Sequence, residues 1–196
     1  MVKLIKNKLS AGWIALIVIG AILFFSVLWF IGSYNGLVKA DETTNEKWAN
    51  VQTAYQRRGD LIPNLVETVK AYSDYEGDIL TQITEARASI GKAGSPSELQ
   101  AAGNQLNSAL SRLLVVVENY PNLKANENYL SLQDELAGTE NRIKVERDIY
   151  NKAVKEYSIK IRRFPTNIVA GMFGFEKREM FEADEGTDQV PTVNFD

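Results

Sequence analysis

The sequence contains no cysteine and no histidine in its 196 residues. Without cysteine the chain forms no disulfide, presents no thiolate nucleophile and holds no metal through sulfur. Without histidine it has no imidazole base for a catalytic triad and no histidine ligand for zinc, di-iron or haem. A glycine-rich phosphate loop is also absent, and no group of carboxylates marks a catalytic cleft. We therefore predict that the protein is not an enzyme and has no catalytic residue, no cofactor and no metal site.

Negative charge exceeds positive charge outside the amino terminus. Lysine and arginine together number 22 against 25 aspartates and glutamates, so the net charge is −3. Lys3, Lys6 and Lys8 supply three positive charges, and everything after them therefore carries a net charge of −6. Because nucleic-acid-binding proteins present basic surfaces to phosphates, this acidic body argues against nucleic acid as a partner.

One long hydrophobic run is present. No charged residue occurs between Lys8 and Lys39, and residues 11–31 are apolar apart from two glycines and a serine. As a helix these 21 residues would rise about 31 Å, close to the thickness of a bilayer core. The run predicts a transmembrane helix over residues 9–33 that contacts lipid. The residues expected at the two membrane interfaces are Trp13, Trp29 and Tyr34.

The alternative reading of this run is a cleaved signal peptide, because residues 38–40 resemble a small-residue cleavage site. The apolar run exceeds the 7–15 residues of a signal sequence, which favours the anchor. Three lysines precede the span, whereas charges of both signs follow it. By the positive-inside rule, residues 1–8 are expected in the cytoplasm and the rest of the chain on the outer side of the cytoplasmic membrane.

Hydrophobic periodicity after the anchor is helical. Residues 126–163 lack proline, have no glycine after Gly138 and repeat an apolar residue every seven positions. The members of this heptad line are Tyr129, Leu136, Ile143, Tyr150, Tyr157 and Phe164. Because such a narrow stripe needs partner helices, the sequence predicts an all-α fold: an amino-terminal transmembrane helix followed by an antiparallel four-helix bundle over residues 34–164.

The boundaries of the other bundle helices follow from turn and capping residues. The first is expected to end near Arg57, since Gly59, Asp60 and Pro63 favour a turn, with a kinked continuous helix as the alternative. The second would run to about Gly91. The sequence Ser95-Pro96-Ser97-Glu98 is a capping box that starts the third, and Asn126 can cap the fourth.

The final segment, residues 165–196, is predicted to be an extended apolar and acidic tail with a short helical turn at most. It has no core of its own and must pack on its own bundle, on a neighbouring subunit or on the membrane. The candidate residues for oligomer or membrane contact are Phe164, Ile168, Val169, Met172, Phe173 and Phe175.

Several blocks resemble the LemA family of bacterial membrane-anchored helical proteins. They are YNGLV (34–38), RRGDLIPNLVETVKAY (57–72), YPNLKANENYLSLQDELAGTENRI (120–143), RDIYN (147–151), AVKEY (153–157), FPTNIVAGMFGF (164–175) and a late Pro-x-Val-x-Phe (191–195). Gly59 departs from the bulkier residue usual in the family. The resemblance implies the same fold, no established enzymatic activity, relatives linked to remodelling of the magnetosome membrane, and some members associated with membrane metalloproteases.

Polar residues within the predicted bundle form two groups. One lies near the second helix and the other along the fourth: Arg57, Arg58, Asp60 and Asn64, and Glu140, Asn141, Arg147 and Asn151. We interpret them as a polar layer that sets helix register or as a solvated face, with a ligand or metal pocket as the alternative. The Arg58-Gly59-Asp60 tripeptide is read as part of a helix junction and not as an adhesion motif.

These inferences predict a non-enzymatic, self-associating scaffold of the bacterial cytoplasmic membrane that shapes or organises the bilayer. Its expected partners are lipid and further copies of itself. The alternative is an adaptor or sensor that binds and regulates a membrane partner such as a metalloprotease.

Overall fold

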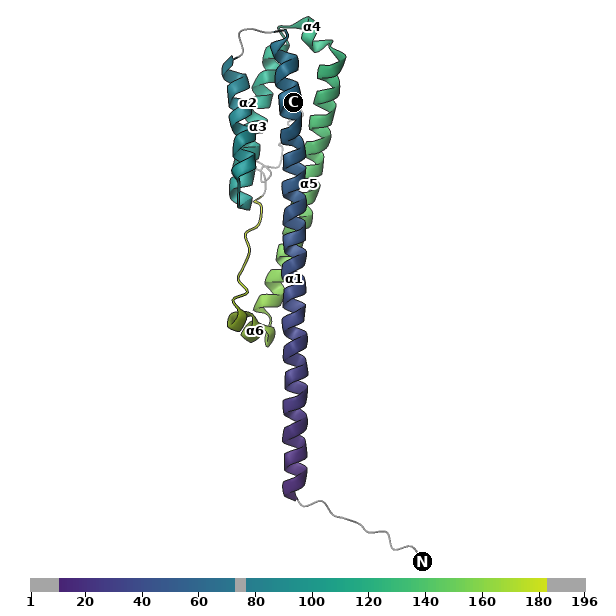
Figure 1. Ribbon diagram of the computed structural model, residues 1–196, viewed down its shortest axis with the longest axis vertical. Helices are drawn as coiled ribbons and strands as arrows, with labels where there is room; N and C mark the ends of the chain where they lie inside the picture. The colour runs from purple at the N-terminus through teal and green to yellow at the C-terminus, as the bar shows by residue number, and fades with distance from the viewer. Residues whose placement is uncertain (1–10, 73–76, 183–196) are drawn as a thin grey trace, which may run out of the picture. The chain divides into compact units, whose positions relative to one another are not determined.

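The computed structural model describes residues 11–72 and 77–182, and every regular element among them is a helix (Figure 1). In chain order the helices are α1 (Ala11–Lys70), α2 (Gly77–Lys92), α3 (Pro96–Val117), α4 (Pro121–Lys124), α5 (Glu127–Arg162) and α6 (Thr166–Phe173). The predicted all-α fold is confirmed. The predicted cytoplasmic segment 1–8 and the acidic end of the predicted tail lie outside the described residues.

The chain divides into two compact units. Unit 1 comprises Met1–Glu42 and Tyr157–Lys177, and unit 2 comprises Thr43–Glu156 and Arg178–Asp196. Helices α1 and α5 each contribute to both units. The predicted division into a span over 9–33, a bundle over 34–164 and a tail over 165–196 stays a prediction.

The first part of α1, in unit 1, is an apolar helix whose side chains the other described residues leave largely exposed. An 18-residue stretch has a mean hydropathy of 2.9, and none of it is buried. A helix that is apolar on all sides and has no protein cover suits a membrane interior. The one hydroxyl in the stretch, that of Ser26, donates to the Ile22 carbonyl at 2.7 Å, so it needs no water. By length and composition, α1 is a candidate membrane-spanning helix.

Unit 1 also contains a small core where α6 packs on α1. Leu37, Val169 and Ala170 are buried together there. The Phe173 ring lies 4.6 Å from the Tyr34 ring, centroid to centroid. The sequence predicted a short helical turn at most in this segment. That prediction is wrong, because α6 has eight residues, which form about two turns. It ends at Gly174, whose φ of 71° is the left-handed conformation that glycine adopts without strain.

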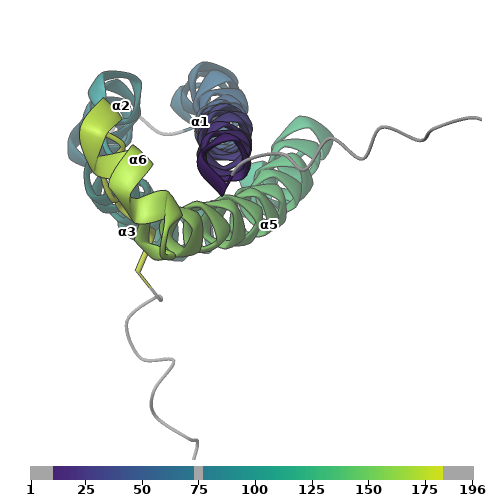
Figure 2. The same ribbon diagram turned by 90° about the horizontal axis from the view of Figure 1, so that it is seen from below.

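Unit 2 is a helical bundle in which successive long helices run antiparallel (Figure 1). Viewed along the helices, α2 and α3 lie side by side (Figure 2). One core joins side chains from α1, α2, α3, α4 and α5, including Leu65, Ile83, Leu106, Leu123 and Ile143. At Gly103 of α3 an added Cβ would come within 2.7 Å of the Tyr55 ring, so glycine lets α1 and α3 approach closely.

The heptad line of α5 is buried as predicted, with one exception. Tyr129, Leu136, Ile143, Tyr150 and Tyr157 are all buried, whereas Phe164 is 77% exposed because α5 ends at Arg162. Both predicted caps are present. The Ser95 hydroxyl accepts from the Glu98 amide at 3.3 Å, and the Asn126 side chain accepts from the Tyr129 amide at 3.0 Å.

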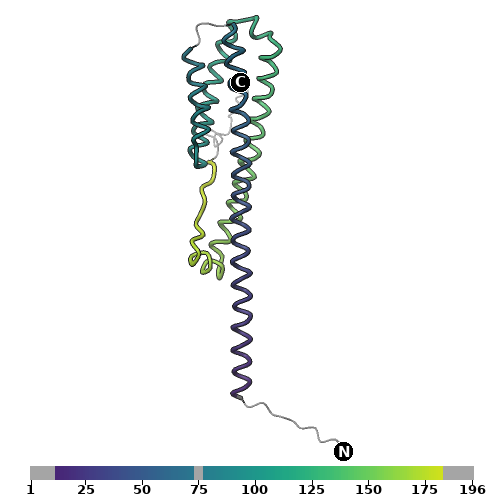
Figure 3. The backbone as a smooth tube through the Cα atoms, in the orientation of Figure 1, coloured from purple at the N-terminus to yellow at the C-terminus, as the bar shows by residue number. Residues whose placement is uncertain are grey.

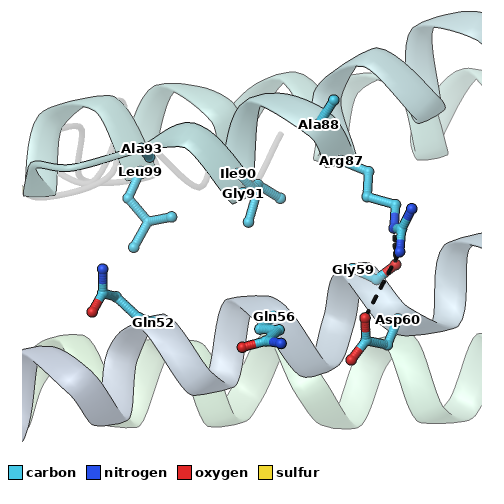
Figure 4. Close-up of a pocket in the computed structure, with 10 residues that line it drawn as sticks. All are labelled: Gln52, Gln56, Gly59, Asp60, Arg87, Ala88, Ile90, Gly91, Ala93 and Leu99. Atoms are coloured by element: carbon cyan, nitrogen blue, oxygen red, sulfur yellow. Dashed lines mark hydrogen bonds and ion pairs between the residues drawn. The ribbon is translucent and has the colours of Figure 1, made fainter.

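The favoured turn over Gly59–Pro63 is wrong, because α1 continues through both residues to Lys70. The predicted second helix is thereby divided between α1 and α2. Pro63 has no amide hydrogen, which leaves the Gly59 carbonyl without its partner four residues along the helix. Arg87 of α2 takes this place: its Nε donates to the Gly59 oxygen at 2.8 Å (Figure 4). A donor on another helix thus binds the Gly59 carbonyl, which lacks its usual partner within its own helix.

Replacing Arg87 with methionine should lower the free energy of unfolding by about 1 kcal/mol, since the Gly59 carbonyl loses its donor. Pro63→Ala restores the missing amide, so the same Arg87→Met change should cost much less in that background. Chemical denaturation followed by circular dichroism measures both. Lys92→Met, also on α2, is the matched control, and equal costs of Arg87→Met in the two backgrounds would refute the assignment.

Candidate functional site

The most deeply buried charged side chain described in unit 2 is that of Arg58, on α1. Arg58 is 5% exposed. Its Nη1 donates to Glu140 Oε2 of α5, and its Nη2 donates to Asn107 Oδ1 of α3 at 2.6 Å. Three helices are therefore joined at one side chain. The Nε of Arg58 is buried and has no hydrogen-bond partner among the described residues.

The electrostatics of Arg58 are set first by burial, which lowers its pKa by removing water from the charged group. The negative charge of Glu140, and then Tyr55, act in the opposite direction. An arginine stays protonated at neutral pH nonetheless. The result is a permanent positive charge inside the bundle, with its carboxylate partner 43% exposed at the surface.

Two cavities of unit 2 meet at Arg58. One, of about 340 Å³, is polar and includes Tyr55, Asn104 and Arg147 in its lining. The other, of about 530 Å³, is lined mainly by apolar groups such as Leu110, Leu114 and Tyr129. Arg58, Asn107 and Glu140 line both. The burial of Tyr129 raises its pKa, so this phenol stays neutral at physiological pH.

A third cavity of about 560 Å³ opens between α1, α2 and the start of α3 (Figure 4). Gln52 and Gln56 of α1 face Ile90 and Leu99 across it. The Arg87 contact to Gly59 and Asp60 closes one end; the ion pair with Asp60 spans 3.8 Å. Its described lining contains one cation, one carboxylate and two amides, and nothing among them converges on a single reacting point.

The second polar arrangement holds the extended chain after α6. The backbone leaves helical geometry after Gly174 and runs extended (Figure 3). Asn151 of α5 makes two 2.9 Å hydrogen bonds with the Phe181 backbone, donating to its carbonyl and accepting from its amide. The Tyr150 hydroxyl donates to the Glu179 carbonyl at 2.9 Å, and burial raises the pKa of this phenol.

The side chain of Phe181 anchors this extended segment in the bundle core. It is 4% exposed, with its ring 5.6 Å from that of Tyr150 and 6.0 Å from that of Trp48. The Arg147 guanidinium lies 5.1 Å from the Phe181 ring, a cation–π contact. Of the three places considered for the tail, residues 178–182 therefore pack on their own bundle.

The eight predicted polar residues do not form one layer. Arg58 and Glu140 are paired inside the bundle, and Arg147 and Asn151 hold residues 181–182. Asp60 lies beside Arg87, whereas Arg57, Asn64 and Asn141 are exposed. Among the described residues no group of three acidic side chains is placed to hold a metal. The ligand-pocket alternative and the register interpretation both stay predictions.

Sequence reasoning missed Asn107, Arg87, Gln100 and Phe181. Asn107 and Gln100 are polar residues of α3, and the helical periodicity of α3 marks only its apolar residues. Phe181 lies in a stretch whose composition predicts only an extended apolar and acidic tail. Each of these side chains acquires its role from a partner at least 28 residues away in the chain. No local signal identifies such pairs.

The predicted contact residues of unit 1 fall into two sets. Val169 is buried, and Phe175 packs on the small core. Phe173 contacts Tyr34 and is half exposed. Phe164, Ile168 and Met172 are 77%, 54% and 67% exposed. Of the predicted interface aromatics, Trp13 and Trp29 are exposed on α1.

Helix α1 contains the candidate membrane span and also contributes to the bundle of unit 2. The fold is therefore that of a helical-bundle protein with a candidate membrane-spanning helix. The chain belongs to the LemA family, whose model matches residues 47–195. The chain is 28% identical over 193 residues to the magnetosome protein MamQ 2 of Paramagnetospirillum magneticum, covering 83% of this chain and 71% of that protein. The magnetosome protein MamQ of Magnetospirillum gryphiswaldense is 24% identical, with coverage of 89% and 73%. Protein LemA of Metamycoplasma hominis is 27% identical, with coverage of 80% and 72%. None of these names describes an enzyme.

Replacing Glu140 with glutamine should destabilise the full chain by about 1 to 2 kcal/mol, because Arg58 keeps its buried charge but loses its counter-charge. The lower part of the range for buried pairs applies because Glu140 is 43% exposed. Glu135→Gln on the same helix should have little effect. In an Arg58→Met background the cost of Glu140→Gln should disappear, and denaturation curves of the four variants measure the coupling. A coupling of zero would remove the pair from the stability argument.

Proposed function

We propose that this protein is a single-pass membrane-anchored scaffold that self-associates in the bacterial cytoplasmic membrane and organises the bilayer around it. The apolar stretch of α1 serves as the anchor. Membership of the LemA family supports a role that does not depend on catalysis. The magnetosome proteins among the relatives support placing this role at a membrane.

The observation that carries the proposal is that one side of α6 packs on α1 while the other side is exposed. One side of this helix buries Val169 and Ala170 against Leu37 of α1. The other side leaves Ile168 and Met172, four residues apart and so on one face, more than half exposed. Phe164, just before α6, is exposed beside them in sequence. We call Phe164, Ile168 and Met172 the α6 patch.

The position of α6 along α1 gives the α6 patch its expected role. Phe173 of α6 contacts Phe30, which lies at the end of the apolar stretch, with ring centroids 6.0 Å apart. The patch therefore belongs at the level where the anchor leaves the membrane. Exposed apolar patches at such a level bind lipid or another protein. We assign the patch to contact with a second copy, since anchored copies share one plane and one orientation.

Serine at Ile168 and Met172 together should weaken self-association of the full chain in lipid vesicles by about tenfold, because the proposed contact between copies loses two exposed apolar side chains that it would cover. Energy transfer between singly labelled copies, measured while lipid is added to dilute the protein, reports the association. The matched control is Val145→Ser with Ile149→Ser, an equally spaced exposed pair on α5. Equal transfer in the α6 and control variants would contradict the role of the patch.

The proposed orientation, with residues 1–8 in the cytoplasm, rests on Lys3, Lys6 and Lys8. Protease added outside intact spheroplasts should then digest the bundle, which contains many lysines and arginines, and spare an amino-terminal tag. Digestion of the tag with protection of the bundle would reverse the orientation. Lysis of the spheroplasts provides the control in which both are accessible.

A further inference from the structure

The extended segment of unit 2 is directed along the crevice between α3 and α5. On α5, the partner of the Phe181 backbone is Asn151, and that of the Glu182 carbonyl is Arg147, one helical turn earlier. On α3, Gln100 both accepts from the Glu182 amide at 3.1 Å and donates to its carbonyl at 3.3 Å. Two side chains therefore bind the Glu182 backbone. From Phe181 to Glu182 the backbone runs toward the start of α5.

The polar cavity begins where this described segment ends. Arg147, which binds Glu182, also lines the 340 Å³ cavity. Gly103 and Asn104, one turn beyond Gln100 on α3, form part of the same lining. The apolar 530 Å³ cavity follows, because both cavities share Arg58, Asn107 and Glu140. We call the two cavities together the α3–α5 groove.

The chemistry of the α3–α5 groove changes along its length. Near Glu182 its described charged groups are Arg147, Arg58 and Glu140, two cations against one carboxylate. Arg58 also holds a buried Nε without a partner among the described residues, a donor suited to a peptide carbonyl. Farther along, the lining includes five leucines, with Asp134 as a further acidic group. The groove therefore fits a peptide that is acidic first and apolar afterwards.

We propose that the α3–α5 groove binds residues 183–196 of the same chain. These residues lie outside the described part of the chain, and their sequence is ADEGTDQVPTVNFD. The acidic residues Asp184, Glu185 and Asp188 come first, followed by Val190, Val193 and Phe195, and then by a fourth acidic residue, Asp196. This order matches the order of charged and apolar lining. The family match extends to residue 195 and so includes this segment.

The length of the segment is sufficient. Arg147 and Tyr129 mark the two ends of the groove on α5, and their 18-residue separation corresponds to about 27 Å along the helix. Fourteen residues can span up to about 46 Å when extended. In an extended peptide the side chains of Val193 and Phe195 lie on one face and that of Thr192 lies on the other. Val193 and Phe195 would therefore enter the apolar cavity. The inference does not depend on the scaffold proposal, since it concerns unit 2 alone.

The absence of cysteine allows a direct test on the full chain in mild detergent. Phe195→Cys is combined with Leu114→Cys, a residue that lines the apolar cavity and is 47% exposed. The control combines Phe195→Cys with Val115→Cys, which is 66% exposed and does not line it. Under mild oxidation the first pair should form an intrachain disulfide about tenfold faster than the control pair, because the bond requires the two Cα atoms within about 7 Å.

Equal rates, or a faster control, would overturn the proposal, since random encounter favours the more exposed Val115 position. A bond formed mainly between two chains would also overturn it and assign the groove to a second copy. A second comparison uses the Phe195→Cys and Leu114→Cys pair: Val193→Asp should slow the intrachain bond about fivefold, and Thr192→Asp should leave it unchanged. Equal effects of these two changes would contradict the extended binding mode.

Discussion

A buried positive charge links three helices of unit 2, α1, α3 and α5. Removing a guanidinium from water costs several kcal/mol, and this cost is offset only where partners with good geometry are present. For Arg58 of α1 the partners are Glu140 of α5 and Asn107 of α3. A shift of one residue in any of these helices would move its group by about 1.5 Å along the axis and about 100° around it. We therefore propose that Arg58 favours one register among those that apolar stripes alone would permit.

The parts of the fold that follow from local pattern were predictable. The heptad line of α5 as far as Tyr157 and the caps at Ser95 and Asn126 depend on spacing within one helix, and these appear where spacing places them. The course of α1 past Gly59 and Pro63 was not predictable in this way. Proline removes a hydrogen bond locally, but the replacement donor is Arg87, 28 residues along the chain. A prediction from neighbouring residues alone includes only the lost hydrogen bond, and it therefore favours a turn.

The candidate site shows the same limit more strongly. Sequence reasoning named Arg58, Glu140, Arg147 and Asn151 as polar residues within the bundle, and the structure gives each a defined partner. The contacts cut across the two sequence groups: Arg58 of the first group pairs with Glu140 of the second, whereas Arg147 and Asn151 bind an extended backbone. Phe181 explains the difference: a single aromatic side chain, buried between Trp48 and Tyr150, fixes a segment that composition alone describes as coreless.

Anchorage changes what a small apolar surface such as the α6 patch can accomplish. Its three side chains cover roughly 400 Å², whereas a stable interface in solution buries about 800 Å² on each partner. Copies free in solution would therefore associate weakly through it. Copies confined to one membrane plane have already lost most translational and rotational freedom, so less of the contact energy is needed to hold them together. Under the proposed function the exposed patch and the apolar stretch of α1 are thus physically linked, because the first would suffice for association only where the second held the chain in lipid.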